Sequence, residues 1–429
     1  MERKFEAIVV GAGPAGCSCG LALARAGVKT LVVERGKFAG AKNMWGGVYY
    51  GRELEALLPE FPDKAPVERW ISRHKFSFLT EDSALSAEFT SRKFSQQPSS
   101  CFSLLRSRFD RWFASKVEEA GAIVAAPLET TDLLFEGSRV TGVMAGGDEL
   151  PADVVIACDG ANSLLAEKAG LRSKLRPKDM KLGVKEVIEL PRQILEQRFN
   201  LRGEEGVAWE FIGTFTRGIP GGGFIYTNRD TLSVGIVVQL EGLVGSKIDA
   251  GSLLEKFKRH PEVAQLIEGG SLVEYSAHLI PASGMRMMPD LYTDGMLVAG
   301  DAAAMTLVTG LVLEGANFAL ASGLAAAETV IEAKKEGDFS RKTLCRYTEF
   351  LTCSSVLKEM KKFRKAPRFL ENPRLYTLYP EIFTELAEEV LRREGKAREK
   401  LWKVFRKSVK SRVSWKQLIR DIMKAKGAL

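Results

Sequence analysis

The chain has 429 residues, of which 45% are hydrophobic, enough to bury a large core in about two or three domains. No run of about 18 apolar residues is free of charge, so the sequence predicts no membrane-spanning segment. Histidine occurs only as His74, His260 and His278, so a catalytic triad or a histidine-rich metal site is not expected, and each histidine is interpreted as structural.

The beginning of the chain is typical of a dinucleotide-binding unit. An apolar strand over residues 7–10 is followed by a glycine-rich turn, a helix and a second strand over residues 30–33. The turn reads Gly11-Ala12-Gly13-Pro14-Ala15-Gly16. Gly11 turns the chain sharply, Gly13 leaves room for a diphosphate, and Gly16 lets the helix lie close to the sheet. The diphosphate is expected on the free N–H groups at the N-terminus of the helix.

The second strand ends at Glu34, which is followed by Arg35. Glu34 falls about 20 residues after the glycines, where a carboxylate accepts hydrogen bonds from the hydroxyls of an unphosphorylated ribose. Glycines also mark ordinary turns, but the order of strand, helix, strand and acid favours a nucleotide site. The segment therefore predicts NAD or FAD rather than NADP.

Two later segments fit the same nucleotide. Arg106 begins a helix and could reach the diphosphate or a ribose. A solvated ion pair with Asp110 is as compatible with the spacing, because residues i and i+4 are neighbours on a helix. An apolar strand over residues 154–158 runs into Asp159-Gly160, a tight turn expected at the edge of the same sheet.

Residues 181–240 contain several apolar runs that are rich in strand-forming residues. Two of these runs are separated by a turn at residues 228–230, and the whole segment is interpreted as an antiparallel sheet. Residues 217–223 form a glycine-rich loop that suits close approach of a ring or a partner. The stretch from Phe76 to Phe94 is expected to add strands.

The choice between NAD and FAD is made near residue 300. A short apolar strand runs into Gly300-Asp301, and Gly310, Gly315 and an alanine-rich helix follow. Asp301 can accept hydrogen bonds from the ribitol hydroxyls of FAD, which NAD lacks. The helix beginning near Glu314 can point its N–H groups at the flavin pyrimidine. A Gly-Asp pair alone is common in turns, but together with the N-terminal turn it predicts FAD.

The last quarter of the chain carries the positive charge. From Lys334 onward there are 26 Lys or Arg against 12 Asp or Glu, whereas the formal net charge of the whole chain is only +8. Apolar residues recur every four positions from Leu401 to Val413, and Ser414 with Gln417 has the spacing of a capping box for a second helix. Basic amphipathic helices favour an anionic membrane surface. A helix packed on the protein with a solvated basic face is the alternative, and no motif indicates nucleic acid.

Over roughly residues 1–335 these segments resemble the flavoprotein superfamily of aromatic hydroxylases and geranylgeranyl reductases. Two segments are similar to its FixC branch of electron-transfer-flavoprotein:quinone oxidoreductases, and so is the stretch from Gly300 to Gly323. These two segments are Glu34-Arg35-Gly36 and Gly40-Ala41-Lys42-Asn43-Met44-Trp45-Gly46-Gly47-Val48. The resemblance implies an FAD enzyme that takes electrons from an electron-transfer flavoprotein heterodimer and passes them to a membrane quinone.

The loop from Gly40 to Val48 fits this interpretation. Its glycines, Gly46 and Gly47 among them, would let backbone approach a flat ring, while Lys42 and Asn43 fix the edge of that ring. A mobile surface loop is the alternative.

The expected fold class is α/β, with a Rossmann-like FAD-binding domain, an inserted antiparallel β-sheet domain for the quinone, and a helical basic C-terminal region. The expected ranges are residues 1–75, 101–180 and 290–335 for the FAD-binding domain, residues 76–100 and 181–289 for the quinone domain, and residues 336–429 for the C-terminal region.

The six cysteines are dispersed and form no C-x-x-C pair, whereas relatives with a fused module hold an iron-sulphur cluster on four clustered cysteines. No metal site is therefore expected in this chain, and Cys17 and Cys19 are interpreted as core thiols. A separate small ferredoxin-like iron-sulphur subunit is expected instead.

Dispersed cysteines and the lack of a signal peptide in this sequence indicate a cytoplasmic protein, peripheral on the inner face of the cell membrane. Two other functions stay open. One is a geranylgeranyl-reductase-like enzyme that saturates prenyl lipids, and the other is an FAD-stabilised scaffold without redox activity.

Overall fold

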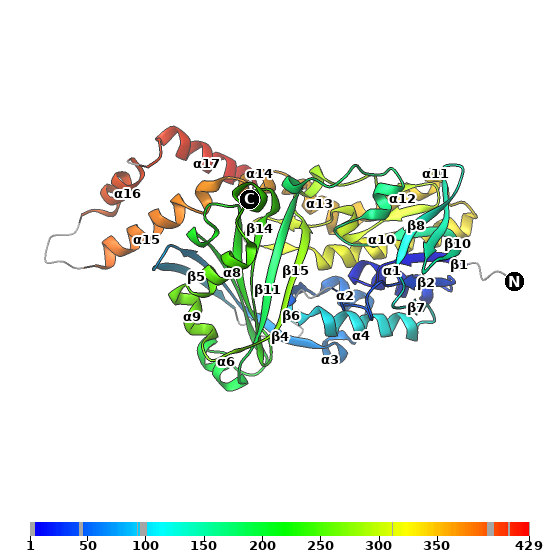
Figure 1. Cartoon of the computed structure of the whole chain (residues 1–429), viewed down its shortest axis with the longest axis horizontal. Coiled ribbons are helices and arrows are strands. Elements are labelled where there is room, and N and C mark those ends of the chain that lie inside the picture. Colours follow the sequence, from blue (N-terminus) through cyan, green and yellow to red (C-terminus); the bar gives the residue numbers. More distant parts are fainter. Residues whose placement is uncertain are drawn as a thin grey trace.

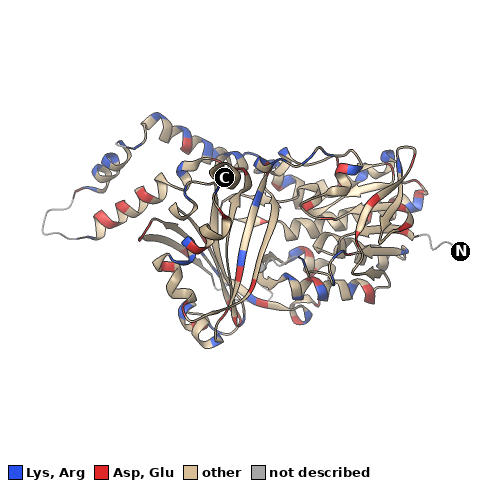
Figure 2. Ribbon diagram, in the orientation of Figure 1, with Lys and Arg blue, Asp and Glu red and all other residues tan. Residues whose placement is uncertain are grey.

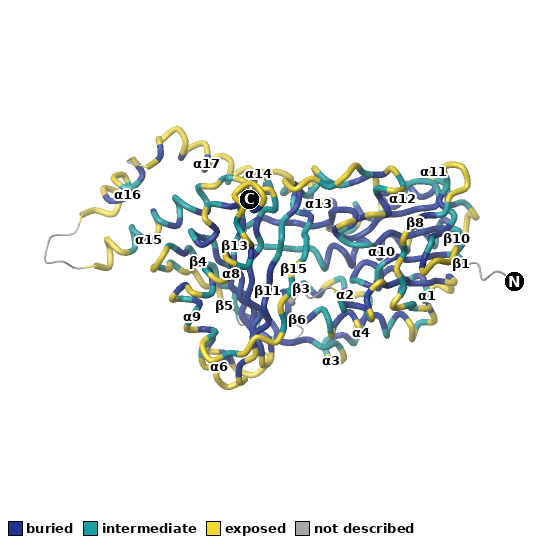
Figure 3. The backbone as a smooth tube through the Cα atoms, in the orientation of Figure 1, coloured by how far each residue is buried: buried dark blue, intermediate teal, exposed yellow. Residues whose placement is uncertain are grey.

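A computed structural model of the chain describes residues 5–42, 46–91, 93–94, 101–310, 312–392, 399–410 and 412–428. The chain folds into two large β-sheets with helices packed on them, and its last helices extend from the end of the molecule opposite β1 (Figure 1). Figure 3 shows that the buried backbone runs through both sheets, whereas the last helices are largely exposed. The structure is therefore of the α/β class, as the sequence predicts.

The first sheet has a parallel core. Its strand order is β16-β17-β10-β1-β2-β7, and the hairpin of β8 and β9 continues from the N-terminal half of β10. The central strands are buried on both faces, which explains their nearly continuous apolar sequence. The strands are β1 (Phe5–Val10), β2 (Thr30–Val33), β7 (Ile123–Ala125), β8 (Thr130–Glu136), β9 (Arg139–Ala145), β10 (Asp148–Ala157), β16 (Tyr292–Thr293) and β17 (Met296–Val298).

Helix α1 (Pro14–Arg25) packs against β1 and β2 and against two later helices, α4 (Arg106–Glu119) and α10 (Ala316–Glu336). The contact between α1 and α10 is close, because a Cβ atom at Gly323 would lie 2.1 Å from the carbonyl oxygen of Ala15. Ser18 of α1 donates a hydrogen bond of 2.9 Å to the carbonyl of Leu320. This contact joins the helix that follows the first strand of the sheet to a helix that comes after its last strand.

Short helices complete this half of the molecule. They are α2 (Arg52–Leu57), α3 (Phe61–Lys64), α5 (Leu164–Lys168), α11 (Arg341–Leu344), α12 (Arg346–Cys353), α13 (Ser355–Lys362) and α14 (Ala366–Leu370), and a small two-stranded sheet of β18 (Leu307–Val308) and β19 (Leu313–Glu314) precedes α10.

The second sheet has nine strands in the order β15-β11-β14-β13-β12-β4-β6-β3, with β5 paired to β4. One face is covered by helices that share an apolar core with it. The strands are β3 (Gly46–Tyr50), β4 (Val67–Leu79), β5 (Ala84–Thr90), β6 (Cys101–Leu105), β11 (Met180–Glu189), β12 (Glu205–Gly213), β13 (Gly221–Thr227), β14 (Thr231–Gln239) and β15 (Ser271–Pro281), and the helices are α6 (Arg192–Phe199), α7 (Leu240–Ser246), α8 (Ala250–Lys258) and α9 (Pro261–Ile267).

Strands β11, β13 and β14 are antiparallel neighbours, and residues 228–230 connect β13 to β14 as predicted. Strand β12 pairs with β4 in the parallel direction, which the sequence did not indicate. Local turn signals carry no information about this pairing, because parallel strands need a long connection.

A buried arginine stabilises this parallel pair. The Arg69 side chain on β4 is almost completely buried. Its guanidinium donates hydrogen bonds to the carbonyls of Gly203 and Glu205 at the start of β12, and to those of Asn228 and Arg229 after β13. One guanidinium thus satisfies backbone groups of two connections.

Strands β3 and β6 lie within residue ranges expected for the FAD-binding domain, yet they pair with each other and with β4 in the second sheet. The chain therefore enters the second sheet before it completes the first. The domain ranges drawn from the sequence stay predictions.

The described chain ends in three helices that we call the C-terminal arm, α15 (Leu378–Leu391), α16 (Leu401–Lys410) and α17 (Trp415–Ala428). Helix α15 packs against β4 and β5, α16 packs on α15, and α17 returns to α14 (Figure 1). The Ser414 hydroxyl accepts a hydrogen bond of 3.2 Å from the N–H of Gln417, so the predicted helix start at Ser414 is confirmed. Among the helices of the described ranges, none combines the length and apolarity needed to cross a bilayer.

We expect Gly323→Val to lower the free energy of unfolding by about 3 kcal/mol, because its side chain would collide with the backbone of α1. The matched control is Gly245→Ala in α7, where an added Cβ meets no heavy atom within 4 Å and helix propensity improves. Thermal unfolding followed by circular dichroism measures both variants. Equal midpoints for Gly323→Val and the parent chain would contradict the close α1–α10 contact.

Candidate functional site

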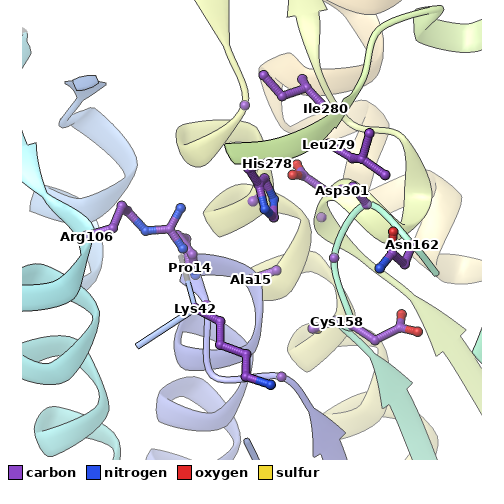
Figure 4. A pocket seen from close by; sticks show the side chains of 18 of the residues that line it. Pro14, Ala15, Lys42, Arg106, Cys158, Asn162, His278, Leu279, Ile280 and Asp301 are labelled. Carbon is purple, nitrogen blue, oxygen red and sulfur yellow. The ribbon is translucent and has the colours of Figure 1, made fainter. Parts of the chain in front are cut away.

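A cavity of about 650 Å³ lies where the parallel strands of the first sheet end. Its wall includes the C-terminal ends of β1, β2 and β10 and, on the other side, residues of β11, β13, β14 and β15. Ligands of parallel α/β sheets bind at this carboxyl edge. Figure 4 shows the cavity from close by.

Most of the residues that the sequence predicts as cofactor contacts line this cavity. They come from seven separate stretches of the chain that folding brings together. They are Gly11, Gly13, Pro14, Ala15, Glu34, Arg35, Lys42, Arg106, Asp159, Gly160, Gly300, Asp301 and Gly315.

Some predicted contacts lie elsewhere. Ala12 is completely buried behind the turn, and Gly16 packs on Gly11. Gly310 has a φ of +94° and faces the side chain of Leu370 on α14. These three residues shape the backbone around the cavity and do not line it.

The loop expected from Gly40 to Val48 is shorter than predicted. Strand β3 begins at Gly46, and Gly46 and Gly47 pair with Leu105 and Leu104 of β6. The glycines thus belong to a strand because their backbone groups are satisfied by β6. Asn43 lies outside the described residues.

The glycine turn fits its backbone surroundings closely. Gly11 has a φ of +104°, and a Cβ atom there would lie 2.3 Å from the carbonyl oxygen of Cys158. A Cβ atom at Gly16 would lie 1.7 Å from the carbonyl oxygen of Gly11. Helix α1 then begins at Pro14 without a side-chain cap, so its first N–H groups are left for a ligand in the cavity.

Glu34 is buried and fixed by the backbone around it. One carboxylate oxygen accepts a hydrogen bond of 3.0 Å from the N–H of Ala12, and the other accepts one of 2.6 Å from the N–H of Gly36. A carboxylate oxygen can accept more than one hydrogen bond, so both can still receive a donor from the cavity.

Arg106 forms the ion pair with Asp110 that its spacing allows, and it also lines the cavity. Its guanidinium donates hydrogen bonds of 2.7 and 2.6 Å to the two carboxylate oxygens of Asp110, which is fully buried. The pair is largely buried, since the Arg106 side chain is only 12% exposed and that of Asp110 is completely buried. Burial opposes its charge, but Asp110 raises the pKa of Arg106 above its ordinary value.

The Gly-Asp turn holds Asp301 at the cavity. Gly300 has a φ of +66°, and its N–H donates a hydrogen bond of 2.8 Å to the hydroxyl of Ser322 on α10. The Asp301 carboxylate points into the cavity (Figure 4). Burial raises the pKa of Asp301, whereas Arg106 and His278 oppose that shift. Helix α10 follows, and its N-cap residue Gly315 provides no side-chain cap.

Asp159 has an unsatisfied oxygen at the cavity. Its Oδ2 accepts a hydrogen bond of 3.1 Å from the N–H of Leu165, whereas its buried Oδ1 has no partner among the described residues. Burial raises the pKa of Asp159. A buried acceptor without a partner is suited to a ligand hydroxyl or N–H group.

The wall from the second sheet was not found by sequence reasoning. It includes the apolar Phe224 and Val237 and the polar Lys185 and His278. From the sequence His278 is expected to be structural, but its ring points into the cavity (Figure 4). The alternation of side chains along β15 was an available signal, but only packing decides which face of a strand meets a cavity.

Three segments of the chain match family models. Residues 4–197 match an FAD-binding domain, residues 180–280 match the ubiquinone-binding segment of ETF-QO, and residues 366–429 match the C-terminal domain of the ETF-QO/FixC family.

Bacterial relatives cover nearly the whole chain. The chain is 44% identical over 423 residues to Protein FixC of Escherichia coli strain K12, which covers 99% of this chain and 98% of the relative. It is 42% identical over 428 residues to the probable electron transfer flavoprotein-quinone oxidoreductase YdiS of the same strain, with 100% of both chains covered. Protein FixC of Azorhizobium caulinodans is 40% identical over 428 residues, with 98% of both chains covered.

The chain belongs to the FixC family. It is an FAD-dependent flavoprotein oxidoreductase of the electron-transfer-flavoprotein:quinone oxidoreductase type. The resemblance seen in the sequence and the choice of FAD over NAD are thereby confirmed.

Solved structures share the fold at low identity. A geranylgeranyl bacteriochlorophyll reductase-like protein of Thermoplasma acidophilum has a TM-score of 0.73 at 18% identity, covering 99% of this chain and 100% of its own. A flavin-dependent halogenase has a TM-score of 0.65 at 17% identity, covering 99% of this chain and 78% of its own. These likenesses confirm the Rossmann-like FAD-binding fold and carry no statement about substrate.

The cavity fits FAD in three respects. The glycine turn leaves a cradle that side chains would close, two helix N-termini without side-chain caps border it, and Asp159 offers an acceptor without a partner. The N-terminus of α1 suits the diphosphate, Glu34 suits the adenosine half, and Asp301 suits the ribitol chain.

We expect Asp301→Ala to weaken FAD binding by about tenfold to a hundredfold, because a hydrogen bond to a charged group contributes about 1.5–3 kcal/mol. The control is Asp148→Ala, since Asp148 is exposed at the other end of β10. FAD retained after gel filtration, measured by absorbance, compares the two. Unaltered FAD occupancy in Asp301→Ala would remove Asp301 from the binding site.

Proposed function

We propose that this chain passes electrons from an electron-transfer flavoprotein through FAD to a membrane quinone. The observation that carries the proposal is one continuous cavity, lined by the glycine turn on one side and by strands β11, β13, β14 and β15 on the other. These strands fall almost entirely within the segment that matches a ubiquinone-binding model. A nucleotide site and an apolar site in one cavity would let bound FAD and a quinone come into contact.

In this proposal the glycine turn and the N-terminus of α1 hold the FAD diphosphate, and the positive Arg35, Lys42 and Arg106 offset its charge. Glu34 accepts hydrogen bonds from the adenosine ribose, and Asp301 accepts them from the ribitol hydroxyls. The predicted roles of Asn43, Gly46 and Gly47 stay predictions.

Bound FAD supplies the two-electron chemistry, while the protein binds and orients it and excludes water. The apolar wall of Phe224, Val237, Leu279 and Ile280 suits a quinone ring, because it lets the ring replace water against apolar surface.

The proposed partners include a separate small ferredoxin-like iron-sulphur subunit. A cluster needs grouped cysteine thiolates, but Cys17, Cys19, Cys101 and Cys158 are buried in the core and Cys345 and Cys353 lie apart from them in sequence. Burial also raises the pKa of Cys19, which disfavours the thiolate that a cluster requires. The electron-transfer flavoprotein heterodimer is the proposed donor, since YdiS bears the name of such an oxidoreductase.

A prenyl-lipid reductase like the geranylgeranyl reductases is the second candidate. The solved structure of a geranylgeranyl bacteriochlorophyll reductase-like protein shares the fold and supports nothing further at its low identity. The family match over the ubiquinone-binding segment favours the quinone.

We expect the FAD of the purified chain to be reduced anaerobically by an electron-transfer flavoprotein once the iron-sulphur subunit copurified from native cells is added, and to be reoxidised by a quinone analogue. Stopped-flow absorbance measures both steps. A matched reaction with a prenyl lipid as the only acceptor is the control. Reoxidation by the lipid and not by the quinone would replace the proposal with the second candidate. Full quinone reductase activity of the chain without the iron-sulphur subunit would remove that subunit from the proposal.

We further propose that the C-terminal arm binds an anionic membrane at the cytoplasmic face of the cell. The arm exposes an apolar surface on α16 and α17, although both helices also bury apolar residues against α15. This surface consists of Leu401, Trp402, Trp415, Ile419, Ile422 and Met423. Lys and Arg positions recur along the same two helices (Figure 2). Apolar side chains with a basic border are typical of helices that lie in a membrane interface.

The arm is fixed to the body of the molecule, so its apolar surface has a defined orientation. Asp421 of α17 accepts hydrogen bonds of 2.7 and 2.9 Å from Arg374 and one of 2.7 Å from the Tyr379 hydroxyl. Burial opposes ionisation, but these donors lower the pKa of Asp421 to about 2. Arg412 pairs with Glu385 of α15. Part of the basic charge therefore contributes to packing, which agrees with the alternative of a helix packed on the protein.

We expect the double variant Trp402→Glu/Ile422→Glu to lose at least about tenfold in affinity for phosphatidylglycerol vesicles, because two apolar anchors are replaced by negative charge. Val244→Glu on α7 is the matched control, since Val244 and Trp402 are both 64% exposed. Cosedimentation with phosphatidylglycerol or phosphatidylcholine vesicles measures binding. Equal binding of the double variant and the parent chain would assign the arm to a protein partner.

A further inference from the structure

His278 is a titratable side chain on the cavity wall to which the FAD-binding groups give no role. It lies on β15, the edge strand of the second sheet, and pairs across the ladder with Gly183 of β11. Figure 4 shows its imidazole extending from β15 into the cavity, beside the Asp301 carboxylate and across from the Arg106 guanidinium. The second sheet therefore brings a proton-binding group to the side of the cavity opposite the glycine turn.

The charges that act on His278 come from three different elements. They are Asp301 in the Gly-Asp turn, Arg106 at the start of α4, and Arg35 after β2. Burial lowers the pKa of His278 and the two arginines add to this, whereas Asp301 opposes it. Together, burial and the two arginines favour the neutral imidazole. A new negative charge in the cavity would raise its pKa, because a nearby opposite charge favours the protonated form.

Reduction of bound FAD creates such a charge. Two electrons and one proton convert the flavin ring to an anion, and a quinone needs two electrons and two protons to become a quinol. The reduced ring can return only one of these two protons. A group that faces the same cavity can supply the second proton.

We propose that His278 takes up a proton when the bound FAD is reduced and gives it to the quinone when the FAD is reoxidised. The inference rests on the proposed function for its acceptor. On reduction, neutral His278 and one solvent proton become imidazolium. On reoxidation, the anionic reduced ring, imidazolium and quinone become oxidised ring, neutral imidazole and quinol. Two electrons and two protons reach the quinone, and the charge on each side of this step is zero.

The other two histidines are in surroundings that exclude this role. His74 Nε2 lies 3.7 Å from the Sγ of Cys101, and its ring packs edge-on against Phe94. His260 caps α9, accepting a hydrogen bond of 3.2 Å from the N–H of Glu262. Neither of these histidines lines the cavity, so a substitution of either one provides a matched control.

The test measures protons taken up per two electrons, from the slope of the FAD midpoint potential against pH in the purified holoprotein. Above about pH 7, where the reduced ring keeps one proton, we expect about two protons for the parent chain and about one for His278→Gln. His74→Gln should match the parent chain. FAD content and circular dichroism identify any variant that fails to fold, in which case His278→Asn is measured instead. One proton in the parent chain, or two in a folded His278 variant, would overturn the inference.

A kinetic measurement separates this inference from the proposed function. With a quinone analogue, His278→Gln should lower kcat by about a hundredfold with KM little changed, because a lost proton donor slows the chemical step and not binding. The potential measurement needs no quinone. A changed slope without any quinone reduction would support proton uptake by His278 and refute the quinone as acceptor, whereas normal quinone reduction with an unchanged slope would refute the role of His278.

Discussion

The backbone contact between α1 and α10 is the constraint on which the nucleotide side of the cavity depends. Gly16 lets the first turn of α1 lie on the carbonyl of Gly11, and Gly323 lets α10 lie on the carbonyl of Ala15. Ser18 and Ser322 use their hydroxyls to satisfy backbone groups where the helices leave no room for larger side chains. Close packing without side chains fixes the position of the N-terminus of α1, and hence of its unbonded N–H groups.

The second sheet depends on the first for its function, because neither sheet encloses the cavity alone. The glycine turn and the Gly-Asp turn form one wall, and β11 and β15 carry Lys185 and His278 on the other. Buried Arg69 holds the connections around β12 in place, so the strands that face the cavity keep their register. Burial shifts the pKa of Asp159, His278 and Asp301, so a change of charge inside the cavity also shifts the protonation of its neighbours.

The C-terminal arm combines ion pairs that hold its helices in place with exposed apolar residues. Asp421 of α17 pairs with Arg374, which precedes the arm, and Arg412 pairs with Glu385 of α15 within the arm. The exposed apolar residues of the same two helices include Trp402 and Trp415, whose ring centroids are 6.0 Å apart. The arm therefore combines a fixed attachment with an exposed apolar surface.

The sequence by itself determined the nucleotide half of this protein. The glycine turn, Glu34, Arg106 and Asp301 were identified from local spacing, because backbone turns and helix starts have signatures within a few residues. The cavity's other wall was decided only by tertiary structure. His278 and Phe224 lie on strands whose alternation of apolar and polar residues is visible in the sequence. Which face of each strand meets the cavity, and the parallel pairing of β12 with β4, depend on contacts between distant segments. The start of β3 at Gly46 was missed for the same reason, since its partner β6 lies more than fifty residues later.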